Sequence, residues 1–258
     1  MAPGTWQRLQ GALYRFGILG ICPLIVRRAR EWLRHRRAFC LQRDDEVFDR
    51  DHGVDTCRMV ALSRLSIDSA WKQFAGDYGA TPLGIFRTMM KRLWIDYSRY
   101  AFMDLGCGKG KTLLVAAEHG FNRVIGVDFS QELCAIARAN VNEFCRTHAN
   151  SNIEVICADA TSVQPPAGNC VLYFCNTFGE PLMQQVIQNI GRSLSEQPRD
   201  VFIVYCNPQW RQVCDSAGFL KKHATSLWSP EWYIIYRAVR HHQGFKADTS
   251  VASCGTTR

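Results

Sequence analysis

Three acidic residues lie at or near the ends of apolar runs of the sequence, and a glycine-rich turn comes after the first of them. The apolar run of residues 100–105 is interrupted only by Asp104, and glycines then occupy positions 106, 108 and 110. Glycine has no Cβ to block the close approach of a ligand. Residues 111–118 have a helical pattern, so the turn lies at a helix N-terminus, with free N–H groups and a positive dipole end. A strand, a glycine-rich turn and a helix form a frame that holds an adenosine-type cofactor.

The second acidic residue narrows the kind of cofactor. Residues 123–127 are predicted to form the next strand, and Asp128 follows it, about 20 residues after the turn, where a carboxylate accepts hydrogen bonds from ribose hydroxyls. A dinucleotide fingerprint would need glycine where Lys111 stands, which argues against a nicotinamide-dependent oxidoreductase. Asp104 would repel a pyrophosphate, but it suits the cationic sulfonium and ammonium groups of S-adenosylmethionine.

In these residues the chain resembles the class I S-adenosylmethionine-dependent methyltransferases. Their first motif is an acidic residue two positions before G-x-G-x-G, and the run from Asp104 to Gly110 matches it. Their later acidic positions match Asp128 and Asp159. The resemblance implies an α/β fold: a doubly wound, mostly parallel seven-stranded sheet with a C-terminal antiparallel hairpin, plus an N-terminal helical extension. The candidate cofactor-binding residues are Tyr78, Thr81, Asp104, Gly106, Cys107, Gly108, Gly110, Asp128, Phe129, Asp159 and Ala160.

The turn at residues 77–82 carries a second resemblance. A tyrosine-containing turn that ends in Thr-Pro, followed by a helix and the glycine-rich motif, is similar to membrane-linked protein-lysine methyltransferases over about residues 74–145. Those enzymes usually have an acidic residue where Lys109 stands. Tyr78 and Thr81 either contact the cofactor or serve as turn packing and as the cap of a helix that starts at Pro82.

The sequence motif for the methyl acceptor is weaker than the motifs for the cofactor. Residues 170–175 are predicted to form a strand, and ligands of open α/β sheets bind at the carboxyl ends of strands. Asn176 follows this strand and is the candidate catalytic residue, orienting an acceptor through its amide oxygen; otherwise it is a strand-end turn residue. The favoured acceptor is a protein lysine or a small molecule. The alternatives are an RNA or DNA acceptor, motivated by Asn176-x-Phe178, and a non-catalytic cofactor-binding module.

Charge and cysteine content bear on partners and compartment. The chain has 258 residues and a formal charge of +8, and six arginines and one acid lie between residues 27 and 37. Such a cluster fits a nucleic acid, an anionic membrane surface or a solvated helix face. The 12 cysteines include no C-x-x-C pair, so no metal site is predicted. Their placement in apolar runs predicts buried thiols in a reducing cytoplasm.

The remaining segments define the predicted organisation. Residues 1–55 form a basic and apolar extension whose acidic part, 41–55, is a turn-rich linker. Residues 56–240 form the cofactor-binding domain, and 241–258 a disordered tail. The apolar run near residues 14–26 is shorter than the roughly 20 residues that span a bilayer. Residues 14–37 are therefore expected either to make peripheral membrane contact or to act as a lid, in a cytoplasmic protein with or without membrane association.

Overall fold

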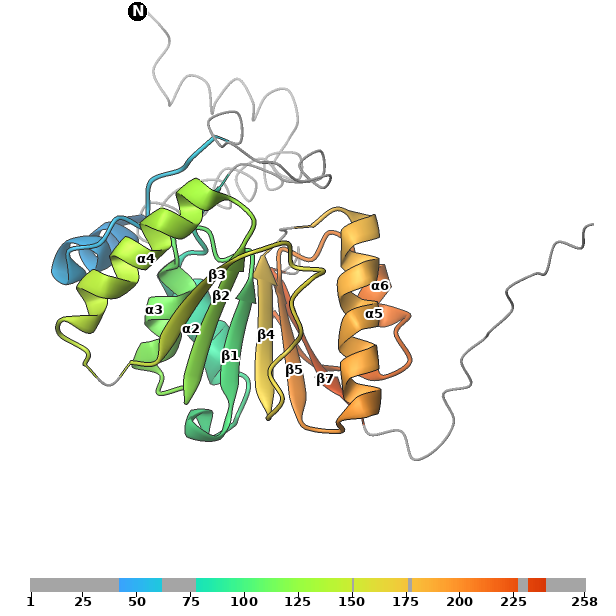
Figure 1. The fold of residues 1–258 in the computed structure, drawn as a ribbon. Helices are drawn as coiled ribbons and strands as arrows, with labels where there is room; N and C mark the ends of the chain where they lie inside the picture. Colours follow the sequence, from blue (N-terminus) through green and yellow to red (C-terminus); the bar gives the residue numbers. More distant parts are fainter. Residues whose placement is uncertain (1–41, 62–77, 150, 176–177, 227–231, 240–258) are drawn as a thin grey trace, which may run out of the picture.

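A computed structural model describes residues 42–61, 78–149, 151–175, 178–226 and 232–239. The central element is a seven-stranded sheet in the order β3-β2-β1-β4-β5-β7-β6 (Figure 1). Its strands are β1 (Ala101–Leu105), β2 (Arg123–Asp128), β3 (Ile153–Cys157), β4 (Cys170–Cys175), β5 (Val201–Cys206), β6 (Leu220–Thr225) and β7 (Tyr233–Ala238). The first five pair in parallel, whereas β7 runs antiparallel to both β5 and β6. The predicted sheet with its C-terminal antiparallel hairpin is confirmed.

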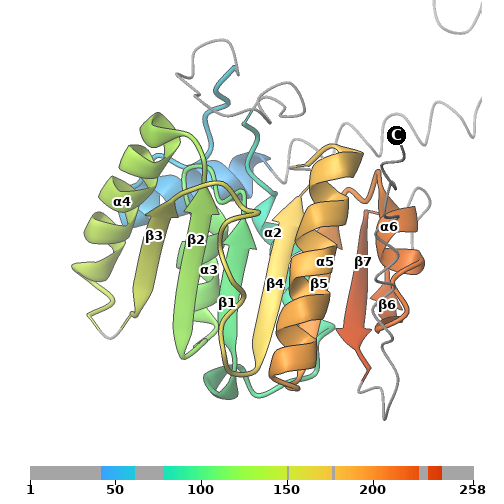
Figure 2. The ribbon, with the colours of Figure 1, turned by 45° about the vertical axis from the view of Figure 1, so that its right-hand side comes forward.

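Helices cover both faces of this sheet (Figure 2). They are α2 (Leu83–Lys91), α3 (Lys111–Glu118), α4 (Gln131–Cys145), α5 (Glu180–Glu196) and α6 (Arg211–Asp215), with a 3₁₀ turn, η3, at Tyr97–Arg99. Helices α2, α3 and α4 contribute to the core on one face, and α5 and α6 to the core on the other. The crossovers between the parallel strands therefore lie on opposite faces, as in a doubly wound fold.

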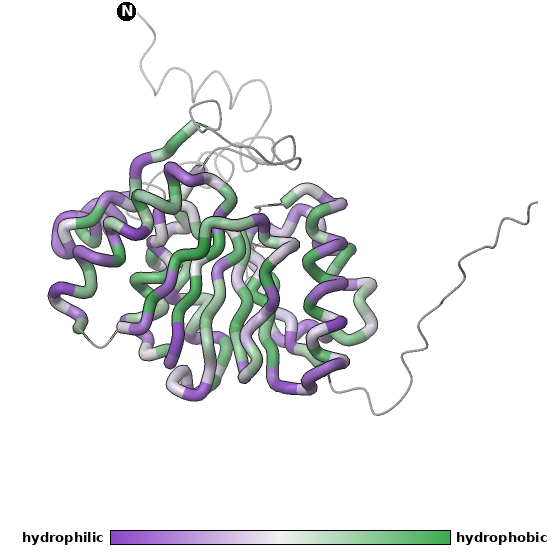
Figure 3. The backbone as a smooth tube through the Cα atoms, in the orientation of Figure 1, coloured by the Kyte–Doolittle hydropathy of each residue, from purple (hydrophilic) through white to green (hydrophobic). Residues whose placement is uncertain are grey.

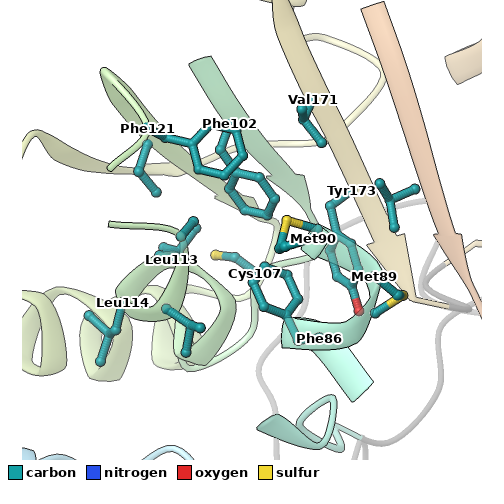
Figure 4. Close-up of a cluster of buried hydrophobic side chains, with 14 of the residues drawn as sticks. Phe86, Met89, Met90, Phe102, Cys107, Leu113, Leu114, Phe121, Val171 and Tyr173 are labelled. Atoms are coloured by element: carbon teal, nitrogen blue, oxygen red, sulfur yellow. The ribbon is translucent and has the colours of Figure 1, made fainter. Parts of the chain in front are cut away.

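The strands are apolar on both faces because both are covered. The hydropathy colouring in Figure 3 shows the apolar residues concentrated in the sheet. Figure 4 shows one of the two core layers, in which the rings of Phe86 from α2, Phe102 from β1 and Tyr173 from β4 come together. Phe86 lies edge-on to the other two, with centroid distances of 5.7 Å to Phe102 and 5.4 Å to Tyr173. Asp104 interrupts β1 on this side of the sheet, and its position therefore requires a functional explanation.

The acidic stretch before residue 56 differs from its prediction. A linker is expected there, but residues 42–52 are helical. Phe48 is buried in the core formed with α2, α3 and α4. Asp49 accepts hydrogen bonds from the backbone N–H groups of Thr56 and Cys57 at 2.7 and 2.8 Å. The sequence pattern missed this helix because two of its acids, Asp45 and Asp49, bind neighbouring elements instead of facing solvent.

Two smaller predictions also need correction. Thr81 does not cap α2: Pro82 holds the N-cap position, and the N–H of Leu83 donates to the Asp45 carboxylate at 2.8 Å. Cys157 is exposed at the end of β3, so it is not one of the buried thiols. Among the described residues, no helix is both long and apolar enough to cross a membrane. The arginine-rich segment and the C-terminal tail lie outside the described residues.

Candidate active site

The glycine-rich turn lies between β1 and α3, where the sequence places it. Gly106, Gly108 and Gly110 have φ angles of 107°, 53° and 84°, which L-residues with a side chain rarely adopt. The N–H groups of Gly106 and Cys107 both donate to the carbonyl of Val127, at 2.7 and 3.0 Å. The turn is thus bonded to the end of β2, and its remaining N–H groups lie at the start of α3.

Asp104 is a buried carboxylate with one unsatisfied oxygen. Its side chain is 2% exposed, and its Oδ2 accepts a hydrogen bond from the hydroxyl of Thr112. Its Oδ1 has no hydrogen-bond partner. Burial raises the pKa of Asp104 to about 8; the Thr112 hydrogen bond lowers it, and the charges of Cys175 and Asp128 raise it further. A buried acceptor without a partner is costly, so this oxygen is suited to receive a cationic donor from a ligand.

Asp128 lies at the end of the neighbouring strand and is fully bonded. Its Oδ2 accepts from the N–H of Gly108 at 2.9 Å, and its Oδ1 from the N–H of Ser130 at 2.9 Å. Burial raises its pKa, although the backbone donors of Ser130 and Gly108 act in the opposite direction. Ser130 in turn caps α4 by accepting from the N–H of Leu133 at 3.2 Å. Asp128 therefore links the glycine-rich turn to the first turn of α4.

Tyr78 lies directly against the glycine-rich turn. A Cβ built on Gly108 would be only 2.1 Å from Cε2 of Tyr78. The Tyr78 hydroxyl donates to the carbonyl of Thr56 at 2.8 Å. Thr81, by contrast, lies further along the edge, with its hydroxyl 2.6 Å from the hydroxyl of Tyr173. Tyr78 therefore contacts the predicted cofactor turn, whereas Thr81 lies beside β4.

The two lysines of the turn are the feature that sequence reasoning missed. Lys109 and Lys111 are 2% and 3% exposed. Their Nζ atoms lie 3.1 Å from carboxylate oxygens of Asp55 and Asp45 respectively. The side chain of Asn140 joins the same two segments, because its amide donates to the carbonyls of Asp55 and Lys109 at 3.0 and 2.9 Å. The acidic residues before residue 56 are visible in the sequence. Their pairing with the two lysines is not, because about 54 or more residues separate each acid from its lysine.

The third acidic position follows β3, next to the end of β2, where the N–H of Ala158 donates to the carbonyl of Asp128 at 2.9 Å. Asp159 follows β3 and is partly buried, and its Oδ1 accepts from the N–H and hydroxyl of Thr161 at 2.8 and 2.6 Å. Phe129 and Ala160 are partly buried at the same strand ends. The candidate catalytic residue, Asn176, lies outside the described residues. The structure thus brings Asp104, Asp128 and Tyr78 to the glycine-rich turn and places Asp159 within a turn of its own.

A pair of cysteines completes this edge of the sheet. Cys175 and Cys206 end β4 and β5 and are partners in the parallel register. A hydrogen bond from the Cys206 thiol lowers the pKa of Cys175, and burial opposes that shift. Cys175 is also close enough to Asp104 to influence the pKa of that carboxyl. The sequence indicated only that the two cysteines are apolar-strand thiols.

The chain matches one family of known proteins and is similar to several solved structures. Residues 102–197 match a family described as a methyltransferase domain. No curated protein sequence matches the chain. Among solved structures, an RNA methyltransferase from Salinibacter ruber in complex with S-adenosyl-L-homocysteine is 19% identical, with a TM-score of 0.44; the match covers 65% of this chain and 97% of that one.

Two further structures are similar at the same remote level. A SAM-dependent methyltransferase from Aquifex aeolicus is 14% identical with a TM-score of 0.45, covering 60% of this chain and 89% of that one. A predicted N6-adenine-specific DNA methylase from Listeria monocytogenes is 16% identical with a TM-score of 0.45, covering 62% of this chain and 52% of that one. The comparisons do not point to the membrane-linked protein-lysine methyltransferases that residues 74–145 resemble.

The chain carries a methyltransferase domain over residues 102–197. The matched domain contains the glycine-rich turn, Asp104 and Asp128, so the family match and the site coincide. The residues present fit S-adenosylmethionine, because the unpaired Oδ1 of Asp104 suits a cationic group of this cofactor.

Proposed function

We propose that this enzyme transfers the methyl group of S-adenosylmethionine to an amine nitrogen, carried by a protein lysine or by a small molecule. The observation that supports this acceptor is the charge at the carboxyl edge of the sheet. Asp104 lies near the end of β1, Asp128 ends β2 and Asp159 follows β3. The helices that start at this edge carry acids in their first turns, Glu132 in α4 and Glu180 in α5. Such an edge attracts a cationic cofactor and a cationic acceptor.

The lysines of this edge do not offset that charge. Lys109 and Lys111 are buried and paired with Asp55 and Asp45, so they are not available to bind phosphates. A nucleic-acid acceptor needs lysines and arginines that neutralise its phosphates. Because both lysines of the cofactor turn are already paired, the described edge favours an amine over a polyanion.

The chemistry requires alignment more than it requires a strong catalytic group. The bound cofactor supplies both the methyl group and its leaving group, so the chain has to hold the two reactants in line and exclude water. In this proposal Asp104 binds the cationic end of the cofactor and Asp128 its ribose. Asn176, directly after β4, orients the acceptor nitrogen, which must be unprotonated to attack. Tyr78 covers the turn and limits the access of water.

The acceptor class is tested with labelled cofactor. The full-length enzyme is incubated with S-adenosylmethionine carrying a radiolabelled methyl group and a fractionated lysate, and the product is treated with protease, nuclease or organic solvent. Release of the label by protease, or its extraction as a small molecule, is the expected result. Release by nuclease would overturn the amine proposal. Asp104→Asn serves as the control for label that enters without the enzyme's site.

A further inference from the structure

Three helix ends meet on the α2–α4 side of the fold, at the opposite end of α3 from the cofactor turn. His52 ends the helical residues 42–52, Glu118 ends α3, and His148 follows α4. Nε2 of His52 lies 3.4 Å from Oε1 of Glu118. One ligand atom from each of the three residues lies within 4.8 Å of the others. No metal site was predicted from the sequence, because these residues are far apart along the chain.

Both histidines present the nitrogen that a metal needs. Nδ1 of His52 lies 3.0 Å from the carbonyl of Phe48, and Nδ1 of His148 lies 3.2 Å from the carbonyl of Phe144. In the tautomer that is protonated at Nδ1, each ring donates to this carbonyl, and Nδ1 of His148 also lies 3.0 Å from the Thr147 hydroxyl. Nε2 of each neutral ring then has a free lone pair. Ligating histidines in metal sites are oriented by this kind of bond from the other ring nitrogen.

The three side chains are also held in place before any ion arrives. The ring of His148 stacks on Phe144 with a centroid distance of 3.9 Å and an interplanar angle of 2°. The ring of His52 lies 5.7 Å from that of His148, with an interplanar angle of 28°. Arg87 donates to Oε2 of Glu118 at 2.9 Å, which leaves Oε1 facing His52. With side chains 19% and 22% exposed, His52 and Glu118 remain accessible to an ion from solvent.

We propose that His52, Glu118 and His148 bind a divalent transition-metal ion, Zn²⁺ by preference. Zinc takes imidazole nitrogen and carboxylate oxygen at about 2.0–2.2 Å in tetrahedral geometry, which puts neighbouring ligand atoms about 3.3–3.5 Å apart. The 3.4 Å between His52 and Glu118 already has this value. A ring nitrogen of His148 lies within 4.8 Å of the ligand atoms of the other two residues, and water fills the fourth position.

The site is structural, because it lies away from the chemistry. Helix α3 starts at the glycine-rich turn and ends at Glu118, roughly 10 Å further along its axis. The helix that ends in His52 also carries Asp45, which pairs with Lys111, and Asp55 follows it and pairs with Lys109. A metal at His52 therefore fixes the segment whose acids hold the two lysines of the cofactor turn. The ion would stabilise the fold, and it would tighten cofactor binding.

The test measures zinc binding to the full-length, chelator-treated protein. A zinc concentration about 100-fold above Kd should raise the Tm by roughly 5 °C. Co²⁺ in place of Zn²⁺ should give the intense visible absorption of a four-coordinate site. His148→Gln and Glu118→Gln should each lose both signals. The Kd for S-adenosyl-L-homocysteine should fall severalfold when zinc is added to the unmodified protein.

The matched control is His119→Gln. His119 follows Glu118 directly and bonds the carbonyl of Val115 through Nδ1 at 2.8 Å, in the same way as the two proposed ligands, but it is outside the cluster. This control matters because the chain has 12 cysteines, any of which also attracts zinc. If His119→Gln and His148→Gln lose the zinc-dependent rise in Tm equally, or neither loses it, the three residues form only an ion pair with stacked rings and the proposal fails.

Discussion

The ends of β1 and β2 carry the same side chain in opposite states. Asp128 receives two backbone N–H groups, from Gly108 and Ser130, and is part of the frame. Asp104, on the neighbouring strand, receives one hydroxyl and keeps one buried oxygen without a partner. The fold satisfies Asp128 by itself, whereas Asp104 is satisfied only when a ligand supplies a donor. Asp128 therefore stabilises the structure of the site, whereas Asp104 is available to bind the cofactor.

Removing the charge of Asp104 should have the largest effect. Asp104→Asn keeps the shape but loses the charge that pairs with a cationic ligand, and its amide presents a donor toward the ligand's own donors. We expect the Kd for S-adenosylmethionine to rise at least about 100-fold, since a hydrogen bond to a charged group together with a buried mismatch costs roughly 3 kcal/mol or more. Calorimetric titration measures it. Unchanged affinity would mean that Asp104 does not contact the cofactor.

The same substitution at Asp128 should behave differently. Asp128→Asn leaves one oxygen to accept two N–H groups, so either Gly108 or Ser130 loses its partner. We expect the ligand-free protein to lose about 1–3 kcal/mol of stability, the cost of an unsatisfied buried group, whereas Asp104→Asn should cost little or add stability. Denaturant unfolding of both variants without cofactor measures the contrast. Equal losses would show that the unpaired oxygen of Asp104 carries no penalty.

The pH dependence of stability sharpens the same contrast. Burial raises the pKa of Asp104 from 3.8 to about 8, so between these values the native protein holds a proton that the unfolded chain has released. The free energy of unfolding of the ligand-free protein should therefore fall as pH rises from about 4 to about 8. Asp104→Asn should flatten this decline. Urea unfolding at pH 5, 7 and 9 is the measurement, and parallel curves for the two proteins would contradict it.

The smallest predicted effect concerns Tyr78, which covers the turn next to both acids. Tyr78→Phe keeps the ring against Gly108 but removes the hydrogen bond to the Thr56 carbonyl. We expect a loss of about 0.5–1.5 kcal/mol of stability and a change in cofactor affinity below tenfold. Tyr78→Ala removes the ring as well and should change affinity more. If the two variants bind the cofactor alike, the ring takes no part in the cofactor site.

Much of the fold was predictable from local pattern. Apolar runs placed β3 and β4 at their observed bounds, and Ser130 marked the start of α4, where it accepts from the N–H of Leu133. These features depend on neighbours a few residues away. The helix at residues 42–52 was not predictable in the same way, because its Asp45 pairs with Lys111 and Leu83, which lie far along the chain. From its residue types alone, an acidic segment is predicted to be exposed to solvent; only its partners show that it is partly buried.

The sequence by itself determined the cofactor turn and the order of acids around it, since glycine spacing and strand-end carboxylates are local properties. It therefore determined the class of reaction. Only the tertiary structure decided that Asp104 keeps an unpaired oxygen while Asp128 does not, and that His52, Glu118 and His148 converge. The physical reason is the same in both cases: burial and pairing depend on which distant segments pack together, and residue types alone do not encode those partners.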